Sequence, residues 1–176
     1  DYGLMAMTQT ISSLLMILSG DGINVALIQR KELTDRMVRQ AFGLLISINV
    51  GLALLQLLLA PLAAAYYKEP RIADLLMVMA VNFLLLPFVG LPKALCRRDM
   101  DFKTPAICNF VAGILSAITT LVMAWAGHGV WSLVGGQIVM LACNAIGLVF
   151  YGHRLVWPDF RMTEIGGLFR FGATIM

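Results

Sequence analysis

The sequence GDGINVALIQRKELTDRMVRQ, at residues 20–40, joins the end of one apolar segment to a strongly basic connection. It places one acid, Asp21, inside the apolar segment, and four cations follow that segment: Arg30, Lys31, Arg36 and Arg39. An apolar segment that ends in a cluster of Lys and Arg is typical of the cytoplasmic end of a membrane span. This stretch therefore predicts a membrane protein and the direction in which its first span runs.

The composition of the whole chain agrees with this prediction. Hydrophobic residues make up 60% of the sequence and charged residues 13%, and the mean hydropathy is +0.85. The apolar residues form runs of about twenty, the length that a helix needs to cross a hydrocarbon layer of about 30 Å. Residues 52–62 do not alternate between apolar and polar side chains, as the strands of a membrane barrel would. We expect an all-α, polytopic bundle of transmembrane helices.

Five complete spans and the start of a sixth can be laid out along the sequence. The sixth begins near Leu168, and the chain starts with Asp1 rather than Met. We therefore expect the chain to be an excerpt of a longer protein. The five complete spans are predicted at residues 4–28, 41–65, 72–95, 105–126 and 130–151.

The charges of the connections between spans predict how the bundle lies in the membrane. Eleven of the 13 Lys and Arg fall in the first, third and fifth connections, at 29–40, 91–103 and after 151, and two fall in the second. Positive connections are retained in the cytoplasm, so we expect these three on the cytoplasmic side. Four of their cations are candidates for contact with lipid headgroups, although topology alone also explains them: Arg30, Lys31, Arg97 and Arg98.

Polar side chains inside the spans are the candidates for a functional cavity. Asp21 is the one ionisable residue well inside a predicted span, where a carboxylate costs a few kcal/mol unless it faces a polar interior. Asn24 lies three residues later, on nearly the same helical face. Asn49 and Asn82 add amides in the second and third spans. These four residues either line a polar cavity or hold helices together through hydrogen bonds.

The third predicted span contains Pro87, Gly90 and Pro92. Proline removes a backbone donor and bends a helix, so this part of the span is expected to kink or loosen. Two interpretations remain open. The bend is either static or a hinge in a moving bundle.

The sequence does not predict an enzyme. It contains no nucleophile elbow, zinc-protease motif, phosphate-binding loop or closely spaced pair of carboxylates at a plausible depth. The three cysteines and two histidines lack metal-ligand spacing, so no metal and no cofactor are expected. The net charge of +3 is explained by the connections, and nucleic acid is not an expected partner.

Several short motifs resemble those of one bacterial family. They are DYG at 1–3, ALIQRK at 26–31, LPKAL at 91–95, RRDMDF at 97–102 and GVWSL at 129–133. With these motifs the chain resembles polysaccharide exporters of the Wzx type, in the multidrug/oligosaccharidyl-lipid/polysaccharide exporter superfamily. The similarity extends over essentially the whole chain.

The resemblance implies a flippase of 12 to 14 helices in two lobes that moves undecaprenyl-diphosphate-linked oligosaccharide across the bacterial inner membrane by alternating access. Residues 1–153 would be helices 2–6 of the N-terminal lobe, and 154–176 a cytoplasmic linker and the start of the next helix. The partners would be the bilayer, the lipid-linked substrate and the polysaccharide polymerase or export machinery. A coupling ion, proton or sodium, is left open. The alternatives are a cation-coupled drug exporter of this superfamily and a non-transporting scaffold for glycan assembly.

Overall fold

The computed structural model describes residues 2–17, 19, 23–24, 27, 34–151 and 158–159. Asp21, Arg30 and Lys31, which the sequence singled out, lie outside these described residues. The long helices are α1 (Tyr2–Ile17), α3 (Asp35–Tyr67), α4 (Arg71–Arg98), α5 (Lys103–Trp125) and α6 (Val130–Tyr151). The all-α prediction is confirmed, because α3 to α6 are each long and apolar enough to cross a membrane.

The structure describes the first part of the first predicted span. The described helix α1 has 16 residues and ends at Ile17, whereas the prediction ran to residue 28. Ser19 lies in a bend and its backbone N–H donates to the carbonyl of Met16 at 3.0 Å. Sixteen residues rise about 24 Å, which is less than the thickness of the hydrocarbon layer. Residues 23, 24 and 27, in the second part of the predicted span, are also helical, and the other residues between 20 and 28 lie outside the described part of the chain.

Helix α3 begins six residues earlier than predicted because Thr34 caps it. Thr34 has extended backbone angles, and its side chain accepts a hydrogen bond from the N–H of Met37 at 3.3 Å. This satisfies one of the free donors of the first turn. Arg36 and Arg39, assigned to a connection from the sequence, are therefore in the first turns of a helix. With 33 residues, α3 is about 50 Å long and extends beyond a hydrocarbon layer.

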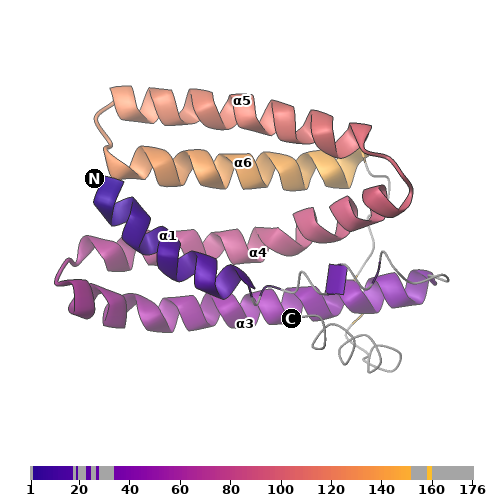
Figure 1. Cartoon of the computed structure of the whole chain (residues 1–176), viewed down its shortest axis with the longest axis horizontal. Helices are drawn as coiled ribbons and strands as arrows, with labels where there is room; N and C mark the ends of the chain where they lie inside the picture. The colour runs from indigo at the N-terminus through magenta and orange to yellow at the C-terminus, as the bar shows by residue number, and fades with distance from the viewer. Residues whose placement is uncertain are drawn as a thin grey trace.

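Helix α4 continues through both of its prolines and ends at Arg98. The third connection, predicted at residues 91–103, is consequently only the turn between α4 and α5, and residues 91–98 are helical. The helix changes direction along its second half, as Figure 1 shows. Pro87 and Pro92 therefore bend this helix and do not end it, as prolines do where packing holds the flanking turns in place.

Asp101 precedes Phe102, the N-cap residue of α5, and satisfies free backbone donors at the start of that helix. Its Oδ1 accepts hydrogen bonds from the backbone N–H groups of Lys103 and Thr104, each at 3.1 Å. Hydrogen bonds from the side chain and backbone of Thr104 hold the pKa of Asp101 below its ordinary value. A negative charge at this place stabilises a helix N-terminus.

The four long helices form one layer in the order α5, α6, α4 and α3, and α1 crosses its face (Figure 1). Helix α1 contacts α3, α4 and α6. The core beneath the bent end of α4 combines side chains from three parts of the chain, among them Leu27, Leu45 and Leu91. There, the rings of Phe42 and Phe88 meet edge to face at a centroid distance of 5.4 Å. Packing thus ties the segment after α1 to α3 and α4.

Helix α5 packs closely on α6 and leaves its other face exposed. Ser116 Oγ donates to the carbonyl of Gly136 at 2.7 Å, and a Cβ at Gly136 would lie 3.2 Å from the carbonyl oxygen of Ser116. Small residues allow this approach, as is usual between membrane helices. The outer face of α5 carries exposed large apolar side chains such as Phe110 and Leu121, which suits contact with lipid.

Candidate functional site

A small polar cavity lies where α4 bends. It has a volume of about 30 Å³ and is lined by three parts of the chain: the segment after α1, the middle of α3 and the proline-containing half of α4. The segment after α1 contributes Ser19 and Asn24, α3 contributes Leu45 and Asn49, and α4 contributes Leu86, Pro87 and Gly90. We call these seven residues the amide cavity. They include four residues that the sequence singled out.

Asn49 is the central polar residue of the amide cavity. Its side chain is 1% exposed, and its Nδ2 donates to the carbonyl of Ser19 at 3.0 Å and to that of Leu45 at 2.8 Å. The first of these bonds joins α3 to the bend after α1. Its Oδ1 is buried and has no hydrogen-bond partner within the part of the chain that the structure describes. Among the described residues, Asn49 Nδ2 therefore has two hydrogen-bond partners and Asn49 Oδ1 has none.

Asn24 lines the same cavity from the segment after α1. Its Oδ1 is also buried without a partner among the described residues, although the side chain as a whole is half-buried. The Nδ2 atom lies beside α4, since a Cβ at Gly90 would be 3.0 Å from it. The absence of a side chain at Gly90 thus leaves room for this amide.

The three proposed hinge residues do not all lie at the amide cavity. Pro87 and Gly90 line the amide cavity, whereas Pro92 lies outside it and is half-buried. Because Pro87 has no N–H, the carbonyl of Phe83 loses its usual donor four residues later. The bend of α4 is therefore joined to a polar site. Whether α4 moves about this bend stays a prediction.

Asn82 does not line the amide cavity, but it belongs to a wider set of buried acceptors. Its side-chain oxygen is buried without a partner in the described part of the chain, as are those of residues in α1, α3 and α6. A buried acceptor without a partner costs about 1–3 kcal/mol, so such groups in a bundle indicate surfaces that meet water, substrate or further helices. The other members of this set are Ser12, Gln56, Gln137 and Asn144.

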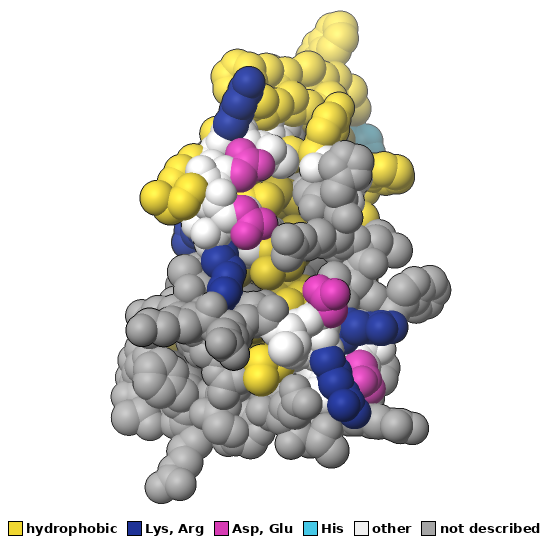
Figure 2. All heavy atoms as spheres, turned by 90° about the vertical axis from the view of Figure 1, so that its right-hand side faces the viewer, with side chains coloured by type: hydrophobic (Ala, Val, Ile, Leu, Met, Phe, Trp, Pro, Cys, Tyr) yellow, Lys and Arg dark blue, Asp and Glu magenta, His cyan; other side chains and the backbone are white. Residues whose placement is uncertain are grey.

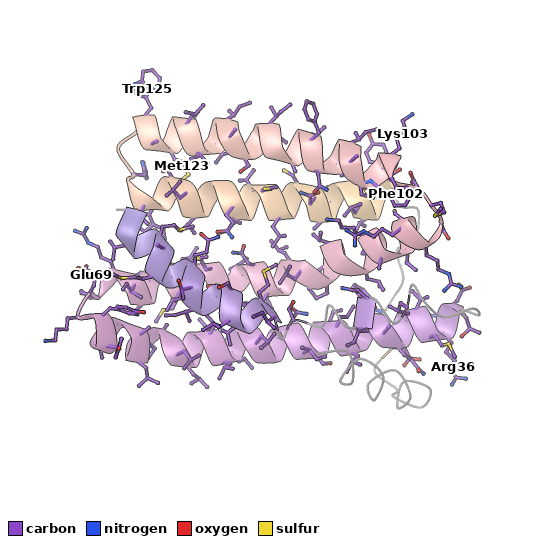
Figure 3. The ribbon with its side chains drawn as sticks, in the orientation of Figure 1. Arg36, Glu69, Phe102, Lys103, Met123 and Trp125 are labelled. Atoms are coloured by element: carbon purple, nitrogen blue, oxygen red, sulfur yellow. The ribbon has the colours of Figure 1, made fainter. Side chains whose placement is uncertain are left out.

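The charged side chains gather at one end of the bundle. Figure 2 views that end and shows Lys and Arg interleaved with Asp and Glu, and Figure 3 places Arg36 and Lys103 there, opposite the end that carries Glu69 and Trp125. Arg97 is exposed in the last turn of α4. Arg98 is half-buried, and its Nη1 donates to the carbonyl of Leu27 at 3.0 Å. Of the two arginines, Arg98 therefore has a structural contact.

A larger open pocket lies at the opposite end and was not predicted. Its volume is about 430 Å³, and it lies where the starts of α1, α4 and α6 meet the turn between α5 and α6. Its polar side chains include Arg71, Asp74 and His128, with Trp131 beside them. No sequence pattern joined these residues, because their common position depends on the packing of α6 against α4.

Among the residues that the structure describes, no group of three or more His, Cys, Asp and Glu is placed to hold a metal ion. Cys96, Cys108 and Cys143 are free thiols. The described part of the chain therefore offers amides, charged ends and apolar surface.

The chain is similar to several bacterial proteins that are named for the biosynthesis of polysaccharides. The chain is 22% identical to the lipopolysaccharide biosynthesis protein WzxC of Escherichia coli (strain K12) over 174 residues, covering 98% of this chain and 35% of that protein. It is 25% identical to the succinoglycan biosynthesis transport protein ExoT of Rhizobium meliloti (strain 1021) over 179 residues, covering 100% of this chain and 36% of that protein. The teichuronic acid biosynthesis protein TuaB of Bacillus subtilis (strain 168) is 23% identical over 155 residues, covering 86% of this chain and 32% of that protein.

The chain thus spans about a third of the length of these relatives. No solved structure matches it at a significant level. The model of the family described as polysaccharide biosynthesis protein, in contrast, matches residues 1–176. Since this match covers every residue and the described helices are those of a membrane bundle, the chain belongs to the family of polysaccharide biosynthesis proteins.

Proposed function

We propose that this chain forms part of a transporter that flips undecaprenyl-diphosphate-linked oligosaccharide across the bacterial inner membrane by alternating access. The family match over the whole chain carries this proposal. The name of one relative, the succinoglycan biosynthesis transport protein, supports transport as the activity. On this proposal residues 1–153 belong to the N-terminal lobe, and further helices complete the substrate path.

The buried amides support a transporter over a passive scaffold. A scaffold gains nothing from acceptors that remain unpaired inside its spans, because each such group destabilises the bundle. A transporter needs polar groups whose partners change between its two states. Asn24, Asn49, Asn82 and Gln137 supply such groups from the segment after α1 and from α3, α4 and α6.

The charged end supports recognition of a diphosphate. The outward-facing cations of α4 and α5, including Arg97 and Lys103, are exposed. Each cation near a membrane surface contributes about 1 kcal/mol to the attraction of an anionic headgroup. We place this end in the cytoplasm, where the lipid-linked sugar would be loaded.

The proposal is tested by deleting the gene of the full-length protein in a host that makes the corresponding polysaccharide. We expect loss of surface polysaccharide and accumulation of lipid-linked repeat units on the cytoplasmic side, both restored by the wild-type gene. Normal polysaccharide in the deletion strain would contradict the proposal. Increased drug sensitivity with normal polysaccharide would instead support a drug exporter.

A matched pair of variants tests the charged end. Arg97→Gln removes an exposed cation there, and Lys68→Gln removes an exposed cation at the opposite end. We expect Arg97→Gln to weaken loading of the lipid-linked substrate about fivefold, the equivalent of about 1 kcal/mol, and Lys68→Gln to leave it unchanged. Equal effects of the two variants would show that diphosphate recognition does not depend on this end.

A further inference from the structure

A pocket of about 430 Å³ lies at the end of the bundle that carries Glu69 and Trp125 (Figure 3), where the starts of α1, α4 and α6 meet the turn between α5 and α6. We call it the Trp131 pocket, after one of the residues that line it, and the structure describes all of these residues. Small-molecule sites have volumes of about 300–1,000 Å³. The Trp131 pocket is therefore large enough for a small ligand.

Buried apolar side chains from three helices form the floor of the Trp131 pocket. Leu75 of α4 and Val130 of α6 are 1% and 8% exposed, and both belong to one buried cluster with Met79 and Val134. Leu4 of α1 packs against this cluster. Close packing holds side chains in defined conformations. The floor is therefore formed before any ligand binds, which lowers the free-energy cost of binding.

The turn between α5 and α6 fixes one side of the Trp131 pocket. The backbone N–H of His128 donates to the carbonyl of Met123 at 3.1 Å, and the carbonyl of His128 accepts from the N–H of Trp131 at 3.1 Å. Gly127 and Gly129, on either side, have φ angles of 81° and 54°, which a residue with a side chain adopts only with strain. The backbone of His128 is thus held between the end of α5 and the start of α6.

The polar side chains that line the Trp131 pocket supply both donors and acceptors. Arg71 and Asp74 are exposed in the first turn of α4. Arg71 only donates hydrogen bonds, the carboxylate of Asp74 only accepts them, and the neutral imidazole of His128 has one nitrogen of each kind. Trp131 is 40% exposed, so part of its indole is accessible to a ligand. The pocket thus offers charge-assisted hydrogen bonds beside an aromatic surface.

This combination of groups fits a neutral sugar better than an anion or an apolar molecule. Each sugar hydroxyl both donates and accepts hydrogen bonds, and the C–H groups of a sugar ring form an apolar face that can lie on an indole. A phosphate group in this pocket would be repelled by Asp74. An apolar molecule would displace water from Arg71 and Asp74 without replacing the lost hydrogen bonds.

We propose that the Trp131 pocket binds a neutral sugar residue of the transported oligosaccharide, with one face of the sugar ring on the indole of Trp131 and its hydroxyls bonded to Arg71 and Asp74. The inference rests on the proposed function, which supplies the oligosaccharide and places this end of the bundle on the outer side of the membrane. A sugar bound here has already crossed the bilayer. The pocket therefore favours the outward-facing state of the transporter over the loading state.

Saturation-transfer NMR on the full-length protein in lipid nanodiscs tests the proposal, with neutral oligosaccharides from partial acid hydrolysis of the host's surface polysaccharide as the probe. We expect the wild-type protein to bind the probe. Trp131→Leu should raise the Kd about tenfold, because leucine keeps an apolar side chain but lacks the flat aromatic face. The matched control is Trp125→Leu. Trp125 is 94% exposed at the same end, projects away from the bundle in Figure 3 and does not line the pocket, so the Kd should stay unchanged.

A second variant tests the hydrogen bonds without touching the packed floor. Asp74→Asn keeps the shape of the side chain and removes its charge, and Asp74 is exposed, so folding should not depend on it. We expect the Kd to rise about fivefold, because hydrogen bonds from sugar hydroxyls to a charged acceptor become bonds to a neutral one. This variant decides the question if Trp131→Leu does not fold.

Three results would overturn the proposal: no binding of the probe by the wild-type protein, equal Kd values for Trp131→Leu and Trp125→Leu, or displacement of the probe by inorganic diphosphate, which would assign the pocket to an anion. If the probe does not bind but the deletion strain accumulates lipid-linked repeat units, only the sugar site fails and the transport function stands. Normal polysaccharide in the deletion strain would contradict the transport function itself and, with it, the ligand proposed for this pocket.

Discussion

Arg97 and Arg98 are adjacent in sequence, and the structure predicts opposite consequences when each is replaced by methionine. Arg98 Nη1 donates to the carbonyl of Leu27 at 3.0 Å, and Arg98 is half-buried whereas Arg97 is exposed. The two substitutions remove the same charge from the same end of α4. They therefore affect membrane topology equally and differ only in the contacts that are lost.

The expected magnitude follows from the hydrogen bond. A hydrogen bond from a charged donor contributes about 1.5–3 kcal/mol, and partial exposure places this one at the lower end of that range. Arg98→Met leaves the carbonyl of Leu27, whose side chain is 2% exposed, without this donor. We expect the free energy of unfolding to fall by about 1.5 kcal/mol for Arg98→Met and by less than about 0.5 kcal/mol for Arg97→Met.

Unfolding of the full-length protein by sodium dodecyl sulfate in mixed micelles measures both values. Hydrogen exchange at Leu27 provides a second readout, because the lost bond should speed local opening there. Equal destabilisation by the two substitutions would refute the reasoning. So would a loss confined to Arg97→Met.

The same unfolding assay tests three further predictions. Gly136→Ala places a methyl group against Thr120 Oγ1, its nearest neighbour, and 3.2 Å from the carbonyl oxygen of Ser116. It should destabilise the α5–α6 pair by about 1–3 kcal/mol. Gly113→Ala meets nothing within 4 Å and should stabilise α5 by about 0.5–1 kcal/mol; the reverse order would contradict the packing. Gln56→Leu loses the hydrogen bond from Nε2 to the Leu76 carbonyl at 2.8 Å, but it also removes Gln56 Oε1, which is buried without a partner in the described part of the chain. The free energy of unfolding should therefore fall by less than about 1 kcal/mol. A larger loss would mean that this oxygen has a partner. The pKa of Asp101 is lowered, so its stabilising contribution is complete above the ordinary Asp pKa of 3.8 and is lost as the pH falls below that value. Asp101→Asn should therefore reduce the loss of stability that the protein shows between neutral pH and pH about 3. An unchanged dependence of stability on pH would count against a role of Asp101 at the start of α5.

Prediction from the sequence was most accurate for features that depend on neighbouring residues alone, such as the length of an apolar run. Apolar length predicted α6 at residues 130–151, where the structure has it, and predicted α5 to within two residues of its ends. The errors concern helix ends. The cap at Thr34 and the continuation of α4 through Pro92 moved residues from connections into helices, because capping and packing outweigh local propensity there.

The candidate site was predicted only as separate residues. Asn24, Asn49, Pro87 and Gly90 were each singled out, one from its helical face and the others from their polarity or backbone properties. Their spacing in the sequence did not show that they line one cavity, because they come from three parts of the chain. The pocket with Arg71, Asp74, His128 and Trp131 was missed for the same reason.

By itself the sequence determined that this protein is a bundle of membrane helices with most of its basic residues near the ends of its spans, and the stretch at residues 20–40 already carried that information. Hydrophobic length and charge are local properties, so they can be read without a fold. Only the tertiary structure decided that Asn49 bonds the carbonyl of Ser19, that Arg98 bonds that of Leu27 and that Asn24 and Asn49 line one cavity. These contacts join residues far apart in the chain and arise from the packing of α3 and α4.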